Sequence, residues 1–186
     1  MKKLLIIISA LFIGSNTVIP SNITPNEQYK VLKVIDGDTV YIDFNRNNTI
    51  EKDERVRLNG IDAFETRISP KLEWQKRNYN LTTQEALGLG YFGQKFAQKE
   101  LLNKYVFAEY SADTQFDPNN RHLMSIYYNC NKQSKCKNYE AEILKKGLAT
   151  VFMKSNLAKD LGQYENKRKI YKNAIKARKL KLKLIN

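Results

Sequence analysis

Carboxylate side chains gather in two short blocks in the first part of the chain. The first block is Asp36-Gly37-Asp38-Thr39, and the second ends in Asp62-Ala63-Phe64-Glu65. The residues that flank both blocks are mostly β-branched, aromatic or apolar, which favours strands. Asp-Gly is a turn signal, so we expect Asp38 at the mouth of a hairpin. Carboxylates at the ends of adjacent strands can share one cation.

An arginine lies in the strand that leads to the second block. Arg57 comes five positions before Asp62, and Leu58 and Ile61 lie between them as apolar strand residues. Hard cations such as Ca²⁺ prefer several carboxylate and carbonyl oxygens, whereas a guanidinium presents a bidentate donor that suits phosphate. Acids and an arginine in this pattern indicate a site for a phosphodiester.

A third block, Asp117-Pro118-Asn119-Asn120-Arg121-His122-Leu123, follows later in the chain. Its first four residues form a turn signal that would present Arg121 at the start of a strand. The three blocks, in this order, resemble the staphylococcal nuclease (thermonuclease) family. The resemblance runs from about Tyr29 to the C-terminus.

The resemblance implies a role for each matching residue. Asp38 and Asp62 would hold a catalytic Ca²⁺ with the main-chain carbonyl of Ala63, and Glu65 would be the general base. The two arginines that would bind the scissile phosphate are Arg57 and Arg121. Two departures from the family pattern leave these groups in place. Phe64 stands where the family usually has proline, and Asn119-Asn120 replace a tyrosine and a glycine.

The spacing of apolar residues predicts a mainly β protein with helices, of the α+β class. The expected strands are 29–35, 39–44, one around Val56, 105–110 and 123–128. The expected helices are 94–103, 139–146, which Gly147 would cap, and 163–183. Five strands with a helix after the third describe a closed five-stranded OB-fold barrel, packed with about three helices. The family resemblance implies the same barrel.

Two segments add features to this plan. The loop Asp43 to Glu54 fits the EF-hand template at Asp43, Asn45, Asn47, Thr49 and Glu54, with Asn48 where glycine is usual. It is a candidate second Ca²⁺ site, although no helices flank it and an Asn-rich hairpin loop gives such matches by chance. The insertion-like stretch 66–90 is expected to be a flexible rim or a small excursion packed by Trp74, Tyr79 and Leu81.

The net charge favours a polyanionic partner, and the N-terminal residues favour export. The net charge is +13, and 42% hydrophobic residues suffice for one domain with a real core. Two lysines and then the apolar run Leu4 to Ile13 predict a signal peptide over 1–20, followed by a linker over 21–28 and the domain over 29–186. We therefore expect a secreted or periplasmic protein without stable membrane association after signal removal. In such a protein Cys130 and Cys136 would form a disulfide.

The residues and the family resemblance together predict a secreted, Ca²⁺-dependent, sugar-nonspecific endonuclease that acts on DNA and RNA, and the resemblance implies a monomer. The resemblance implies that it would leave 3′-phosphate ends. His122 is the only histidine, which excludes mechanisms that need a histidine pair. One alternative is a non-catalytic nucleic-acid-binding barrel, and another is a calcium-binding surface module built on the 43–54 loop.

Overall fold

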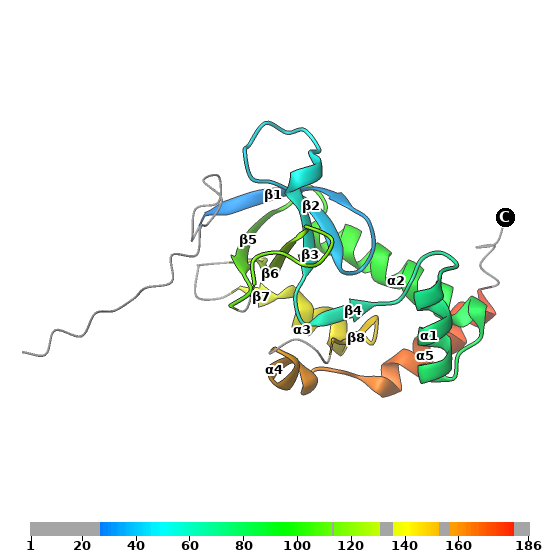
Figure 1. Cartoon of the computed structure of the whole chain (residues 1–186). Helices are drawn as coiled ribbons and strands as arrows, with labels where there is room; N and C mark the ends of the chain where they lie inside the picture. Colours follow the sequence, from blue (N-terminus) through cyan, green and yellow to red (C-terminus); the bar gives the residue numbers. More distant parts are fainter. Residues whose placement is uncertain (1–26, 113, 131–135, 153–156, 181–186) are drawn as a thin grey trace, which may run out of the picture.

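The computed structural model describes residues 27–112, 114–130, 136–152 and 157–180, and shows a closed mixed β-barrel with helices on one side and at one end (Figure 1). The predicted signal peptide and most of the predicted linker lie outside these residues. The barrel strands are β1 (Gln28–Val34), β2 (Thr39–Asp43), β3 (Arg55–Leu58), β5 (Tyr105–Tyr110) and β6 (His122–Tyr128). They confirm the predicted five-stranded OB-type barrel.

The barrel closes through one parallel pair in an otherwise antiparallel set. The order is β3-β2-β1-β5-β6, and β3 then pairs in parallel with β6, with Val56 opposite His122. Alternate residues of each strand point inward, so Val31, Val40 and Ile126 are fully buried in the core. A short strand β7 (Lys137–Asn138) pairs antiparallel with the last residues of β6.

The second acidic block forms a small sheet of its own beside the barrel. Gly60 has a φ of 74° and turns the chain out of β3. The next strand, β4 (Ile61–Ala63), pairs with β8 (Ala149–Val151). Because the chain turns between Leu58 and Ile61, Arg57 and Asp62 come from different sheets and still face one another.

The described residues form five α-helices, which include the three that were predicted. They are α1 (Pro70–Tyr79), α2 (Thr83–Leu101), α3 (Tyr139–Lys145), α4 (Ala158–Gly162) and α5 (Lys167–Lys179). Gly147, with a φ of 65°, follows the end of α3 as expected. The added elements are α1, α4 and the first half of α2.

The insertion-like stretch 66–90 is helical and packed, so the flexible-rim alternative is wrong. Ser69 caps α1 with Pro70 at the first helical position, and Thr82 with Glu85 forms a capping box at the start of α2. Its core residues form a second apolar cluster with Phe64 and α5: Leu72, Leu81, Ala86, Leu87, Leu89, Ile170 and Ala174. Tyr79 and Leu81 pack in this cluster as expected, whereas Trp74 is 49% exposed.

A glycine in α2 brings this helix against the main chain of the acidic block. A Cβ at Gly90 would lie 2.1 Å from the carbonyl oxygen of Glu65. A similar approach occurs at the hairpin mouth, where a Cβ at Gly37 would lie 2.9 Å from the Cβ of Ala63. Both glycines allow the two acidic blocks and α2 to come close together.

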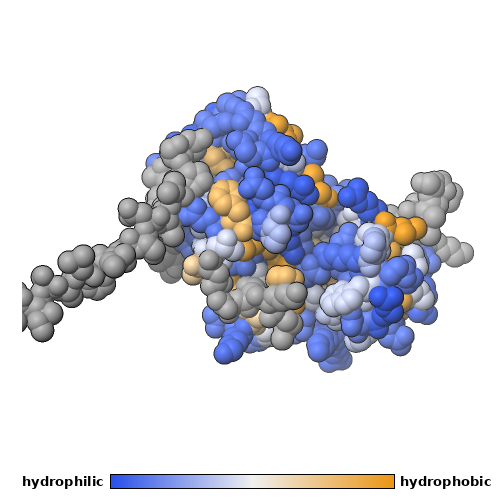
Figure 2. Space-filling model, in the orientation of Figure 1, coloured by the Kyte–Doolittle hydropathy of each residue, from blue (hydrophilic) through white to orange (hydrophobic). Residues whose placement is uncertain are grey.

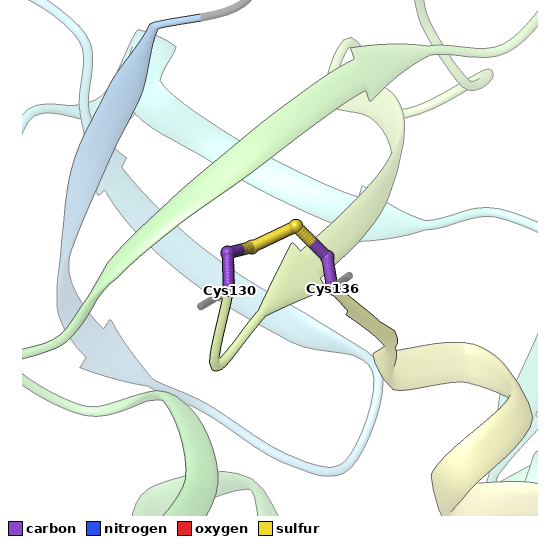
Figure 3. The surroundings of a disulfide bond; sticks show 2 residues. All are labelled: Cys130 and Cys136. Carbon is purple, nitrogen blue, oxygen red and sulfur yellow. A yellow bond between two sulfur atoms is a disulfide. The ribbon is translucent and has the colours of Figure 1, made fainter. Parts of the chain in front are cut away.

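The disulfide predicted between Cys130 and Cys136 is present and links the chain just after β6 to the residue just before β7 (Figure 3). The surface in Figure 2 is mostly hydrophilic, with apolar residues in small scattered groups. On α5, Ile170 and Ala174 are buried as expected, but Tyr171 and Ile175 are about half exposed. Within the described ranges, no helix combines the length and the apolar character that crossing a membrane requires.

Candidate active site

The mouth of the β1–β2 hairpin holds the first acid of the site. Asp38 is buried, and its Oδ2 accepts a hydrogen bond of 2.6 Å from the main-chain N–H of Ala63. Its Oδ1 accepts a bond of 3.0 Å from the hydroxyl of Thr39. Asp36 accepts a 3.0 Å bond from the main-chain N–H of Asp38, as expected for an Asp-Gly turn. Asp38 therefore connects the hairpin to β4.

The guanidinium of Arg57 lies between the two acidic blocks. Its Nη1 is 2.9 Å from Asp38 Oδ2, and its Nη2 is 3.1 Å from Asp62 Oδ1. It also donates to the carbonyl oxygens of Leu58 at 3.1 Å and Ile61 at 2.8 Å. The Arg57 side chain is only 11% exposed, so these contacts hold it in one position.

Helix α1 forms one wall of the site through two residues that the sequence analysis did not select. Lys71 Nζ is 2.7 Å from Asp62 Oδ1 and 3.0 Å from Glu65 Oε1. One turn later, the Gln75 amide donates to the carbonyl of Ala63 at 2.9 Å and accepts from the Glu65 N–H at 3.0 Å. The sequence signal for this wall is the helix start Ser69-Pro70, which places Lys71 and Gln75, four residues apart, on one face of a helix.

The second arginine reaches the site through a hydroxyl group. Arg121 is held by Asp117, whose Oδ2 accepts from Nε at 2.8 Å and lies 2.5 Å from Nη2. Its Nη1 lies 3.5 Å from the hydroxyl of Thr39, which also bonds Asp38. The structure thus brings Arg121 next to the first acidic block, together with the other predicted site residues.

Burial and crowding shift the pKa values of these acids. Burial, and then the charge of Asp38, raise the pKa of Asp36 to about 7. Burial opposes the ionisation of Asp38, but the charges of Arg57 and Lys71 outweigh it and hold its pKa below the usual range. Burial raises the pKa of Asp62 despite Lys71. Burial lowers the pKa of Lys71, but the charges of Asp38 and Asp62 outweigh it and leave the pKa raised.

A cleft of about 500 Å³ opens beside the two arginines. Its lining includes the basic side chains of Arg57, Lys71 and Arg121 and the rings of Phe116 and Phe152. Both rings are partly exposed, at 37% and 43%. A cleft lined by both cationic groups and aromatic rings suits a phosphate joined to a base.

The donor atoms suit a hard divalent cation such as Ca²⁺. The carboxylates of Asp38 and Asp62 and the carbonyl of Ala63 are all oxygen donors. Arg57 and Lys71 form the ion pairs with these acids: Arg57 with Asp38 and Asp62, and Lys71 with Asp62 and Glu65. Across the described part of the chain, no group of three or more His, Cys, Asp or Glu side chains is arranged to hold a metal ion. A cation here would therefore need main-chain, water or substrate oxygens as well.

The 43–54 loop uses its predicted ligands in hydrogen bonds within the loop. Asp43 accepts from the N–H groups of Asn47 and Asn48, both at 3.0 Å. Glu54 Oε1 accepts from the N–H of Phe44 at 2.8 Å, while its buried Oε2 has no hydrogen-bond partner. Asn48 has a φ of 57°, as its place in the template requires. The loop is ordered by its own side chains, and Ca²⁺ binding there stays a prediction.

His122 has a structural environment. One ring nitrogen, Nδ1, lies 2.7 Å from the hydroxyl of Tyr110, and Nε2 lies 2.6 Å from the carbonyl oxygen of Asp53. The ring also packs edge-on against Phe44. His122 therefore holds the start of β6 in place through these contacts.

Comparison with known proteins points to the same family as the sequence motifs. An uncharacterized protein, MJ1439, from Methanocaldococcus jannaschii is 32% identical over 146 residues, which cover 75% of this chain and 67% of that protein. The sequence model of the staphylococcal nuclease homologues matches residues 55–184, a range that includes Arg57, Asp62, Glu65 and the Arg121 turn. The chain belongs to the family of staphylococcal nuclease homologues.

Proposed function

We propose that this protein is an exported, Ca²⁺-dependent endonuclease that hydrolyses phosphodiester bonds in DNA and RNA. Membership of a family of nuclease homologues supports nucleic acid as the substrate class. The net charge of +13 is consistent with a polyanionic partner. The family resemblance further implies 3′-phosphate ends. The predicted signal peptide supports export.

One observation carries the proposal. The structure brings the acids and arginines of three separate sequence blocks together, although they come from a hairpin, strands of two sheets and a distant turn, and both arginines line one cleft. Arg57 touches both Asp38 and Asp62, and Thr39 joins Asp38 to Arg121. A barrel that only bound nucleic acid would need the basic groups but not the buried acids between them.

The side chains divide the chemistry among them. Arg57 and Arg121 would donate to the phosphate oxygens and stabilise the negative charge that grows in the transition state. Glu65 would accept a proton from the attacking water or orient it. Asp38, Asp62 and the Ala63 carbonyl would hold Ca²⁺. When bound, this ion would neutralise phosphate charge and polarise the phosphoryl oxygen.

The experiment is hydrolysis of single-stranded DNA by the full chain, with Ca²⁺ and with EDTA. We expect turnover only with Ca²⁺, and a loss of roughly 100-fold or more in Glu65→Gln and Arg121→Ala, which remove the base and one transition-state donor. Lys76→Met is the control, because Lys76 lies on the same helix and pairs with Glu73, outside the proposed site. Tight, salt-sensitive DNA binding without turnover would instead establish a non-catalytic barrel.

The calcium-binding module remains the second candidate, and the 43–54 loop is its basis. The buried and unpartnered Oε2 of Glu54 favours it, because a cation could satisfy that oxygen. A variant with Asp43→Asn and Glu54→Gln separates the two functions. A module built on this loop would lose all Ca²⁺ affinity, whereas a nuclease would keep its metal-dependent turnover.

A further inference from the structure

The lysine of α1 bonds two of the groups on which the proposed chemistry depends. Lys71 Nζ lies 2.7 Å from Asp62 Oδ1, a proposed metal ligand, and 3.0 Å from Glu65 Oε1, the proposed base. The Asp62 and Glu65 side chains are 11% and 23% exposed. The ammonium group therefore occupies the space between these two carboxylates.

We propose that Lys71 is a built-in counter-cation, which a divalent cation must displace from Asp62 and whose displacement also frees Glu65. This inference rests on the proposed function, because it assigns Asp62 to the metal and Glu65 to the water. In the metal-free protein the base is held in an ion pair. Metal binding and base activation are thereby coupled through one side chain.

The bonding of Asp62 explains why a cation must displace something. Its Oδ1 already accepts from Nη2 of Arg57 at 3.1 Å and from Lys71 at 2.7 Å. Its Oδ2 lies 3.4 Å from the Gln75 amide nitrogen. A third cation cannot approach Oδ1 while both basic groups remain, since their charges repel it at short range.

Lys71 is the group that can leave. Arg57 is 11% exposed and also donates to two main-chain carbonyls, which fix its guanidinium. Lys71 is 41% exposed, and its ammonium ends a flexible four-carbon stem. Gln75 anchors α1 to the main chain at Ala63 and Glu65, so the Lys71 side chain can swing out while the helix stays in place.

The displaced ammonium would remain useful to the reaction. Lys71 lines the same cleft as Arg57 and Arg121. A positive charge at this wall attracts the phosphates that flank the scissile one. The Lys71 ammonium would therefore leave its ion pair with Glu65 and pair with a substrate phosphate instead.

The test is a Ca²⁺ titration of the full chain by calorimetry, without nucleic acid. We expect Lys71→Met to bind Ca²⁺ with a Kd lower by about fivefold or more, since no cation has to be displaced and such a contact is of the order of 1 kcal/mol. Lys71→Gln is a second neutral variant in case the first folds poorly. Lys71→Arg keeps the charge and should stay near the wild-type Kd.

Lys76→Met serves as the matched control. It removes the same charge from the same helix, where Lys76 pairs with Glu73 at 2.9 Å. Its Kd for Ca²⁺ should equal that of the wild type. The fold change in the Lys71 variants should also persist at high salt, because a partly buried contact is screened less than a distant surface charge.

Thermal unfolding gives a second readout. In EDTA, Lys71→Met should melt below the wild type because Asp62 and Glu65 lose their partner. With Ca²⁺ it should gain more than the wild type, because a ligand that binds the native state more tightly stabilises it further. A gain equal to that of the wild type would contradict displacement.

Failure of this inference differs from failure of the proposed function. Equal Kd values in the wild type and both neutral variants, with Ca²⁺-dependent hydrolysis intact, would overturn the role of Lys71 and leave the nuclease. Tighter Ca²⁺ binding in the variants without any hydrolysis would support displacement and overturn the nuclease. Absence of Ca²⁺ binding in all variants would overturn both.

Discussion

At the scale of single residues, one hydroxyl group joins the two halves of the site. The Thr39 hydroxyl donates to Asp38 and lies 3.5 Å from Nη1 of Arg121. Thr39 is buried, so this contact fixes the spacing between the first acid and the second arginine. Asp117 then fixes the direction of the Arg121 side chain from the other end.

Asp117→Asn should weaken catalysis without unfolding the protein. The variant keeps an Oδ1 acceptor for the turn but loses the charged partner of Arg121, so the guanidinium is aimed less well. We expect a fall in kcat of about tenfold to a hundredfold, the usual cost of misplacing a catalytic group by about 1 Å. Steady-state hydrolysis of single-stranded DNA measures it.

Glu142→Gln is the control for this prediction, since Glu142 pairs with Lys145 on the outer face of α3. It should keep wild-type activity. If Asp117→Asn also kept full kcat, Arg121 would not depend on Asp117 for its position.

At the scale of elements, the residues of the site were easier to predict than the helices that position them. The acidic blocks sit in strands with strong turn signals, and Asp38, Asp62 and Arg57 were found from these signals. Lys71 and Gln75 were not, because the stretch 66–90 is polar and its helical pattern is weak. Only tertiary contact with Phe64 and α5 makes Leu72 and Leu81 a core.

Gly90→Ala should damage both stability and activity. Its Cβ would lie 2.1 Å from the carbonyl oxygen and 2.5 Å from the carbonyl carbon of Glu65, so α2 or the acidic block has to move. Overpacking of this kind costs about 1–3 kcal/mol. The melting temperature, measured by thermal unfolding, and kcat should both fall, because the displaced segment carries the proposed base.

Gly162→Ala is the matched control, because nothing lies within 4 Å of the Cβ it would add. This change should leave activity intact and leave the melting temperature equal or slightly higher. Equal melting temperatures for the two variants would show that α2 does not press on the Glu65 main chain.

At the scale of the whole molecule, Glu140 is the most deeply buried acid among the described residues, and it lies away from the site. Glu140 on α3 is fully buried, and its carboxylate accepts from the N–H of Ile126 at 3.0 Å. Burial raises its pKa to about 8, above the ordinary value of 4.5. Because the folded state holds this proton more tightly, the contribution of Glu140 to stability is fully present below pH 4.5 and is lost as pH rises through about 8.

Glu140→Gln should remove this part of the pH dependence. The amide keeps an acceptor for Ile126 and carries no charge at any pH. We expect the melting temperature of the variant, relative to the wild type, to rise steadily between pH 5 and pH 8. The neighbouring groups Tyr127 and Tyr139 titrate above this range and do not mask the effect. A difference that stays constant across this range would show that Glu140 does not change charge there.

The parallel pair between β3 and β6 has a consequence for folding kinetics. It joins Val56 to His122, and the segment between them contains α1, α2 and β5. Contacts between residues so far apart in sequence form slowly, because the loop entropy is lost before the contact forms. Arg57 follows Val56 and Arg121 precedes His122, so both arginines reach the same cleft only when the barrel closes. During refolding, the proposed nuclease activity should therefore return with the slowest folding phase, after the β1–β2 hairpin and its acids have formed.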